Sequence, residues 1–156
     1  MDCHQIQFCD QKRVELLQLQ ALFQIAAFWA KERCAEDLAI AIANSDPVIT
    51  AWDRDLMIGF ARATSDGIYR ATIWDVVIHP EYQGVGLGRR LMQTVLSHPK
   101  MNRVERIYLM TTHQQSFYER LGFEHNTSTT MVLCRQSIST PRSPLTVSQP
   151  ASLPAK

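Results

Sequence analysis

Three glycines, Gly84, Gly86 and Gly88, fall within five consecutive positions, directly after an apolar run and directly before Arg89 and Arg90. Glycine has no Cβ, so an anion can approach the backbone closely, and the first N–H groups of a helix have no partner within that helix. The helix dipole and the two arginines would add to the attraction. A glycine-rich turn that opens a helix is therefore suited to bind phosphate oxygens.

Two common phosphate-binding motifs do not fit this turn. The P-loop requires Gly-Lys followed by Ser or Thr, and no such triplet occurs in the sequence. The dinucleotide fingerprint G-x-G-x-x-G requires a glycine at the position that Arg89 occupies. The spacing that remains is Q-x-x-G-x-G, formed by Gln83, Gly86 and Gly88.

One charged residue, Asp75, interrupts the apolar run ATIWDVVI that precedes the turn. Burying a carboxylate without a partner is costly, so Asp75 is expected either to take part in chemistry or to make a structural hydrogen bond to a neighbouring loop. His79 and Glu81 are further titratable residues at the end of the run, and a histidine directly before proline also fits a solvated cap.

This block resembles the GNAT N-acetyltransferase superfamily. Q-x-x-G-x-G after a strand that ends V-V-I-H-P is similar to the acetyl-CoA pyrophosphate loop of that family, and SFYERLGF is similar to its F-Y-x-x-x-G-F helix and strand. The resemblance covers residues 47–134. More narrowly, ARATSDGIYRATIWDVVIHPEYQGVGLG is similar to the plastid and cyanobacterial subgroup that includes serotonin N-acetyltransferase-like enzymes.

The resemblance implies that acetyl-CoA lies between two splayed parallel strands. The backbone of the first strand would pair with pantetheine, the main chain of the turn would hold the pyrophosphate, and Thr112 is nearest to an asparagine of the family that touches pantetheine. The aliphatic residues of the strand also fit an ordinary core. The implied cofactor-binding residues are Val76, Val77, Ile78, Gln83, Gly84, Val85, Gly86, Leu87, Gly88, Arg89, Thr112 and Tyr118.

The resemblance also implies catalytic roles without a metal or a covalent enzyme intermediate. Tyr118 occupies the position of the acid that protonates the departing CoA thiolate, and a phenol of pKa about 10 can serve a thiol of pKa about 8.5. A tyrosine that only packs against its helix is the alternative. Asp75 is the leading base for the amine, directly or through water, with His79 and Glu81 as alternatives. The N–H of Val77 could stabilise the oxyanion.

The expected fold is α/β, a mixed sheet with helices on both faces. Helices are expected from apolar spacing at Val14 to Trp29, at Ala35 to Ala43, from the glycines to just before Pro99, and at 114–122 with Gly122 as C-terminal cap. Strands are expected at 47–52 and 56–63 around a turn at 53–55, at Arg70 to His79, at 104–110, and as a last strand or hairpin at 123–134.

Length and composition favour one domain. The chain has 156 residues and is 46% hydrophobic, so residues 1–136 are expected to form the GNAT domain and the Pro/Ser-rich residues 137–156 a disordered extension. The net charge of +1 gives no basic stripe for nucleic acid, and neither a membrane span nor a signal segment is expected. A cytoplasmic protein is the default. The four cysteines lack C-x-x-C spacing, which predicts no metal site.

The sequence therefore predicts an acetyl-CoA-dependent transfer of acetyl to a primary amine, with an arylalkylamine such as serotonin as the candidate acceptor. The alternatives are a protein lysine or N-terminal acetyltransferase, and a non-catalytic acyl-CoA-binding regulatory domain. The partner would be a small-molecule or peptide amine, and a homodimer is the base-rate expectation. Aromatic residues that could stack an acceptor or simply fill the core are Phe23, Phe28, Trp29, Trp52, Tyr69 and Trp74.

Overall fold

Five strands form one sheet in the order β1-β2-β3-β4-β5. The computed structural model describes residues 6–134 and divides into two units, Met1–Phe123 and Glu124–Lys156. Strands β1 to β4 pair antiparallel in succession, and β5 adds to β4 in parallel. The strands are β1 Ile6–Asp10, β2 Val48–Asp53, β3 Leu56–Ser65, β4 Arg70–Ile78 and β5 Arg106–Tyr108.

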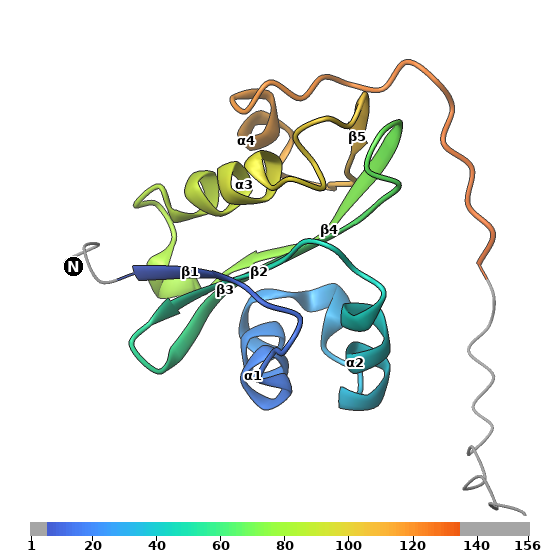
Figure 1. The fold of residues 1–156 in the computed structure, drawn as a ribbon. Coiled ribbons are helices and arrows are strands. Elements are labelled where there is room, and N and C mark those ends of the chain that lie inside the picture. Colours follow the sequence, from blue (N-terminus) through green and yellow to red (C-terminus); the bar gives the residue numbers. More distant parts are fainter. Residues whose placement is uncertain (1–5, 135–156) are drawn as a thin grey trace, which may run out of the picture. The chain divides into compact units, whose positions relative to one another are not determined.

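Helices cover both faces of this mixed sheet, as the sequence predicts. In Figure 1, α1 and α2 lie on one face, and α3 and α4 lie on the other. Short 3₁₀ turns follow α1 and precede α3. The helices are α1 Leu16–Ala26, η2 Phe28–Ala30, α2 Ala35–Ala43, η3 Pro80–Tyr82, α3 Leu87–Ser97 and α4 Gln115–Glu119.

Two hydrophobic cores, one on each face, hold β4 in the middle of the molecule. Phe23 of α1 meets Phe60 of β3 edge to face, with ring centroids 5.8 Å apart, in the core that also contains Val77. Leu91 of α3 and Ile78 belong to the other core. Neighbouring residues of β4 thus point into opposite layers, which explains why the strand is apolar on both sides.

A β-bulge interrupts the pairing of β4 with β3. Phe60 pairs with Val77 and Arg62 pairs with Trp74, so one residue of β3 faces the two residues Asp75 and Val76 of β4. Asp75 has a φ of 55°, in the left-handed region. The bulge therefore redirects the Asp75 side chain relative to a regular strand.

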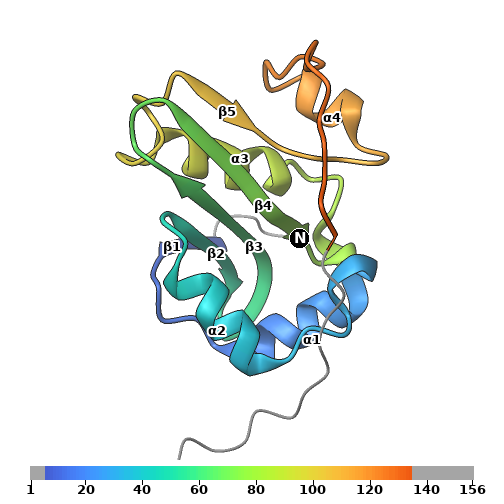
Figure 2. The same ribbon diagram turned by 90° about the vertical axis from the view of Figure 1, so that its right-hand side faces the viewer.

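Strand β4 has a partner on its other side for only part of its length. The parallel pairing with β5 includes Arg70, Ala71 and Thr72 and then ends. Figure 2 shows β5 and the segment after it diverging from β4. The second half of β4 thus leaves its backbone open on this side, and this opening is the splayed strand pair that the family resemblance implies.

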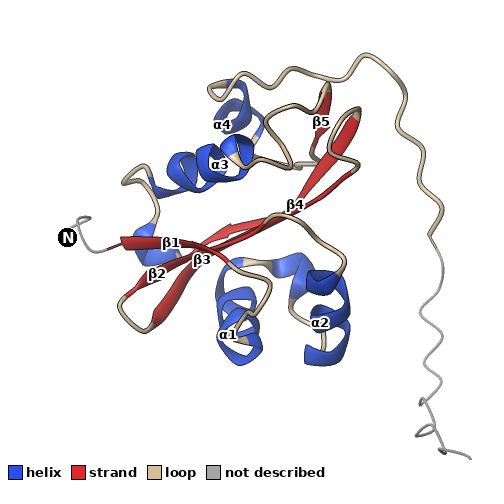
Figure 3. Cartoon of the chain, viewed as in Figure 1, coloured by secondary structure: helices blue, strands red, loops and turns tan. Residues whose placement is uncertain are grey.

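Two parts of the chain differ from the sequence prediction. Strand β1, Ile6–Asp10, was not expected, because five residues that include Gln7 and Asp10 carry a weak strand pattern. The predicted strand or hairpin at 123–134 is wrong, since residues 124–134 form no helix or strand (Figure 3). Threonines and aliphatic residues favour extended backbone, but a strand also needs a ladder of partners.

Other predictions need smaller adjustments. The first helix is shorter than the span Val14 to Trp29, because α1 ends at Ala26 and η2 follows, whereas α2 has the predicted bounds. The predicted extension at 137–156 lies outside the described residues. No helix within residues 6–134 combines the length and hydropathy that crossing a membrane requires.

Candidate active site

The turn between β4 and α3 has the backbone geometry that its glycines permit. Gly84 and Gly86 have φ values of 80° and 85°, a region that other residues rarely adopt, and Gly86 is the N-cap of α3. We call residues 83–89 the phosphate turn. The backbone N–H groups of residues 84–89 donate to no backbone carbonyl in the loops, turns and caps of the described structure. These N–H groups are therefore free to bind an anion.

Side chains around the phosphate turn hold it in place. The Gln83 amide donates to the carbonyl of Ile78 over 2.9 Å, so the glutamine of the motif closes the turn onto the end of β4. The Tyr82 hydroxyl donates to Asp53 over 2.7 Å, and this hydrogen bond is the main reason why the pKa of Tyr82 is raised. Tyr82 therefore remains a hydrogen-bond donor at neutral pH.

His79 acts as a cap. Its Nδ1 accepts from the N–H of Glu81 over 3.2 Å, and its ring meets Tyr82 edge to face. Neither His79 nor Glu81 lines the cavity described below. The structure thus supports the capping interpretation of His79 over its alternative role as a base.

The open edge of β4 presents alternate backbone groups. The N–H of His79 donates to the carbonyl of Ile58 over 2.7 Å, and Val77 pairs with Phe60, so these residues face β3. Because hydrogen-bonding direction alternates along a strand, the N–H groups of Val76 and Ile78 face the opening. The N–H of Val77, which the sequence suggested as an oxyanion donor, therefore faces β3 and not the opening.

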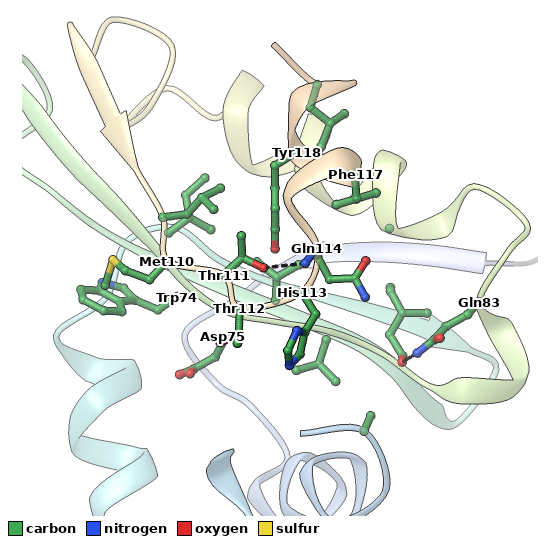
Figure 4. A pocket seen from close by; sticks show the side chains of 18 of the residues that line it. Trp74, Asp75, Gln83, Met110, Thr111, Thr112, His113, Gln114, Phe117 and Tyr118 are labelled. Atoms are coloured by element: carbon green, nitrogen blue, oxygen red, sulfur yellow. Dashed lines mark hydrogen bonds between the residues drawn. The ribbon is translucent and has the colours of Figure 1, made fainter. Parts of the chain in front are cut away.

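A cavity of about 1060 Å³ runs from the phosphate turn along the opening in the sheet (Figure 4). It is large enough for a cofactor and part of a second substrate. Among the implied cofactor residues, Val85 is half exposed and Leu87 is buried in the core, and neither lines the cavity. The predicted residues that do line it are Asp75, Val76, Val77, Ile78, Gln83, Gly84, Gly86, Gly88, Arg89, Thr112 and Tyr118.

Tyr118 extends from α4 into this cavity. Its ring packs edge to face against Phe117 and Phe123, with centroids 5.0 and 5.9 Å away. In Figure 4 its hydroxyl points toward Thr111 and away from α4. Burial raises the pKa of Tyr118 above its ordinary value of 10.0. The ring of Tyr118 therefore packs against its neighbours, and its hydroxyl keeps its proton at neutral pH.

Asp75 lines the same cavity and forms two ion pairs. Its Oδ2 accepts from Nη1 of Arg33 and from Nε of Arg62, each over 2.8 Å, and its side chain is only 6% exposed. No described residue donates to Oδ1. Because every fully buried polar side-chain atom in the described structure has a hydrogen-bond partner, Oδ1 is not fully buried. Oδ1 is therefore accessible from the cavity.

The two arginines reach Asp75 from different elements. Arg62 lies on β3, and its Nη1 donates to Ser45 over 3.1 Å while its guanidinium lies 5.9 Å from the ring of Trp74. Arg33 lies between η2 and α2, with its guanidinium 5.9 Å from the ring of Phe23. Asp75 thus joins the helical layer to the sheet at the bulge.

Several residues that line the cavity or hold Asp75 could not be singled out from the sequence. Arg62 carried a usable signal, because it is a cation within an apolar strand, as Asp75 is an anion within the next one. Arg33, Met110 and His113 carried none, since their places depend on how distant segments fold together. In the view of Figure 4, His113 and Asp75 lie on one side of the segment Thr111–Gln114, and Tyr118 lies on the other.

The aromatic residues separate into two groups. Phe23 and Trp52 belong to or pack against the core beneath α1, and Tyr69 is 63% exposed and does not line the cavity. Phe28, Trp29 and Trp74 line the cavity near Arg33 and Asp75. We call these last five residues the acceptor end. Within residues 6–134, no three His, Cys, Asp or Glu side chains gather as metal ligands would.

Comparison with known proteins gives consistent results. The model of the acetyltransferase (GNAT) domain family matches residues 44–125. The uncharacterized N-acetyltransferase ycf52 of Pyropia yezoensis is 36% identical over 131 residues, which cover 78% of this chain and 74% of that protein. The histone acetyltransferase TAP1 of Glycine max is 36% identical over 132 residues, which cover 77% of this chain and 56% of that protein.

Solved structures share the fold as well. A crystal structure of an acetyltransferase assigned to the GNAT family, from Xanthomonas campestris pv. campestris, superposes with a TM-score of 0.70 at 27% identity. The superposition covers 78% of this chain and 86% of that one. The solved structure thus shares the fold, and the family model spans the phosphate turn.

Proposed function

The chain is an acetyltransferase of the GNAT family, and from that premise we propose that it transfers the acetyl group of acetyl-CoA directly to the primary amine of an aromatic acceptor. One observation carries the proposal. A single cavity is lined by residues of the phosphate turn, whose backbone N–H groups at 84–89 have no partner among the described residues, by the phenol of Tyr118, and by a carboxylate beside three aromatic side chains. These are the groups that such a transfer requires: an anion site, a proton donor, a proton acceptor and an acceptor pocket.

The residues present fit acetyl-CoA, the cosubstrate that GNAT acetyltransferases use. The N–H groups of residues 84–89 would hold the pyrophosphate, and the open N–H groups of Val76 and Ile78 would pair with pantetheine. Arg89 lines the cavity beside the phosphate turn and would add a charge-assisted contact. When bound, acetyl-CoA supplies an activated acetyl group as a thioester.

Tyr118 is the proposed proton donor. Its hydroxyl would pass its proton from Oη to the departing sulfur, because a phenol with a raised pKa is fully protonated at neutral pH. Burial against Phe117 and Phe123 fixes the ring, so the donor needs no rearrangement when the thiolate leaves.

Asp75 is the proposed proton acceptor for the amine, acting directly or through water. An ammonium has no lone pair, so it must lose a proton before or during attack. Both arginines bond Oδ2, which leaves Oδ1 to receive the ammonium proton. His113 lines the same cavity and is the competing acceptor that mutation must separate from Asp75.

The acceptor end supports an aromatic small molecule over a basic protein tail. Phe28, Trp29 and Trp74 offer ring faces against which an indole or phenyl group can stack. Two guanidinium groups surround one carboxylate there, so the local charge is positive. A lysine-rich tail would meet this excess charge with repulsion. The relative named histone acetyltransferase TAP1 keeps the protein-directed alternative as the one to test against.

The test is a panel of acceptors incubated with acetyl-CoA and the protein. Free CoA would be measured continuously and acetylated products would be identified by mass spectrometry. Tryptamine and phenethylamine represent aromatic amines, a lysine-rich peptide represents protein tails, and a reaction without amine gives the background hydrolysis. We expect CoA release to depend on the aromatic amines. If no acceptor raises CoA release above the rate measured without amine, the result would support a non-catalytic acyl-CoA-binding domain. Faster acetylation of the peptide than of the aromatic amines would overturn the aromatic acceptor.

A further inference from the structure

We propose that the acceptor carries a carboxylate next to its amine, and that Arg33 binds that carboxylate. This inference rests on the proposed function, since it narrows the acceptor from aromatic amines to aromatic α-amino acids. Arg33 would act as a binding residue that sets specificity and would take no part in proton transfer.

Arg33 has hydrogen-bond donors to spare. Its Nη1 donates to Asp75, and no described residue accepts from its Nε or Nη2. The side chain is 37% exposed and lines the cavity. Its guanidinium lies near the ring of Phe23, 5.9 Å from the centroid, which restricts its movement. A planar guanidinium with two free N–H directions is suited to a bidentate carboxylate.

Arg62 does not offer the same possibility. Its side chain is 15% exposed, it does not line the cavity, and its Nε and Nη1 already donate to Asp75 and Ser45. Asp75 thus has one arginine behind it, within the protein, and one that faces the cavity. The inner arginine offsets the Asp75 charge, so the charge of Arg33 remains available to a ligand.

The charge at this end of the cavity favours a zwitterion over a simple amine. Arg33 and Arg62 together carry one more positive charge than Asp75 neutralises. An acceptor that brings only an ammonium adds to the positive charge, whereas an α-amino acid brings a carboxylate as well. The ammonium can then face Oδ1 of Asp75 while the carboxylate faces the free donors of Arg33.

The aromatic residues stand at a suitable place for such a ligand. Trp74 directly precedes Asp75, and Trp29 lies four residues before Arg33 on the segment that leads to α2. Both line the cavity. A ligand whose ammonium and carboxylate bind the Arg33–Asp75 pair would therefore have ring faces beside it for its side chain.

The test compares three acceptors that differ in one group: L-tryptophan, L-tryptophan amide and tryptamine. The amide keeps the shape of the amino acid but removes its negative charge. We expect the wild type to use tryptophan with a kcat/KM roughly tenfold above that of the amide, as the loss of a charge-assisted hydrogen bond predicts. In Arg33→Gln this preference should fall to about one.

The ratio of tryptophan to amide and two control variants separate recognition from structural damage. Arg33→Gln also loosens Asp75, so it can lower kcat/KM for every probe, but only recognition changes the ratio of tryptophan to amide. Arg33→Lys retains the charge and should restore part of the ratio. Lys31→Gln removes the same charge from an exposed residue that does not line the cavity, and should leave the ratio unchanged.

The outcomes distinguish the two proposals. If the wild type acetylates tryptamine and the amide with the same kcat/KM as tryptophan, the carboxylate site is wrong and the aromatic-amine function stands. An unchanged ratio in Arg33→Gln would likewise overturn the role of Arg33. If none of the three probes is acetylated, the aromatic acceptor itself is wrong and this inference fails with it.

Discussion

The phosphate turn and the acceptor end both present polar or charged groups to the cavity, but these groups come from different parts of the chain. The phosphate turn uses main-chain N–H groups of consecutive residues, and its conformation follows from glycines at Gly84 and Gly86. The acceptor end uses side chains from separate elements, with Arg33 before α2 and Asp75 on β4, and Arg62 of β3 holds Asp75 from behind. A site made of backbone groups is therefore determined by a short stretch of sequence, whereas a site made of side chains depends on how the whole domain folds.

This difference predicts that damage to the acceptor end spreads further. Asp75→Asn should lower kcat/KM by roughly 10² or more, because it removes the proposed base and weakens the hydrogen bonds of two arginines. The melting temperature should also fall by a few degrees, since both arginines lose a charged partner. Steady-state rates would measure the loss of activity, which follows because an amide accepts no proton, and thermal unfolding would measure the loss of stability.

His113→Asn is the matched variant for that experiment. His113 lines the cavity but lies outside the Asp75 ion-pair network. If Asp75 is the base, His113→Asn keeps kcat/KM close to the wild-type value. A large loss of kcat/KM in His113→Asn, with a nearly wild-type value in Asp75→Asn, would transfer the base role to the histidine and leave Asp75 as a structural centre of the acceptor end.

Tyr118 lies in the same cavity as both regions, and its loss should affect turnover without affecting binding. Tyr118→Phe retains the ring contacts with Phe117 and Phe123 but removes the hydroxyl, so kcat should fall by roughly 10²-fold. The Kd for acetyl-CoA should not change. Single-turnover mixing would establish that chemistry limits the rate. A wild-type single-turnover rate in this variant would assign the proton to water or to another residue.

A substitution in the phosphate turn should weaken cofactor binding without disturbing the acceptor end. Gly86→Val places a branched residue at a φ of 85° and should weaken acetyl-CoA binding by about tenfold, as titration calorimetry would measure. Gly67→Val is a matched control, because Gly67 has a φ of 79° with equally open surroundings but lies in the turn before β4. Equal Kd values in the two variants would show that the strain acts on the fold and that the turn does not bind the cofactor.

The smallest expected effect concerns high pH. Because burial raises the pKa of Tyr118 above 10.0, the phenol stays protonated, and activity should be lost only as the pH rises through that higher value. With tryptophan amide, whose α-amine titrates near 8, kcat/KM should change by less than about twofold between about pH 9 and pH 10. A falling limb within this interval would mean that Tyr118 ionises earlier than its environment implies or that another acid acts.

The features that could be predicted from the sequence are those set by local sequence, and the contacts between distant segments could not be predicted. The phosphate turn, the doubly covered β4 and the opening of α3 could be predicted because glycine spacing and apolar runs are local signals. Asp75 could be selected because a carboxylate within an apolar strand needs a reason. Its partners could not, since the pairing of β3 with β4 includes a bulge and Arg33 is 42 residues away in sequence.

The errors have related causes. Strand β1 is short and partly polar, and it owes its strand conformation to pairing with β2 over residues Ile6–Asp10. Residues 123–134 have strand-forming composition, but the described residues 124–134 form no ladder. Composition predicts a tendency toward extended backbone, and only a partner converts that tendency into a strand.

The left-handed backbone of Asp75 limits what evolution or engineering can place at this position. At a φ of 55°, asparagine and glycine are tolerated along with aspartate, whereas glutamate would keep the charge but meet strain. A replacement that is easy for the backbone is therefore one that removes the charge. If Asp75 is the base, as proposed, one substitution that is neutral for the backbone would end acetyl transfer and leave the conformation of the phosphate turn unchanged.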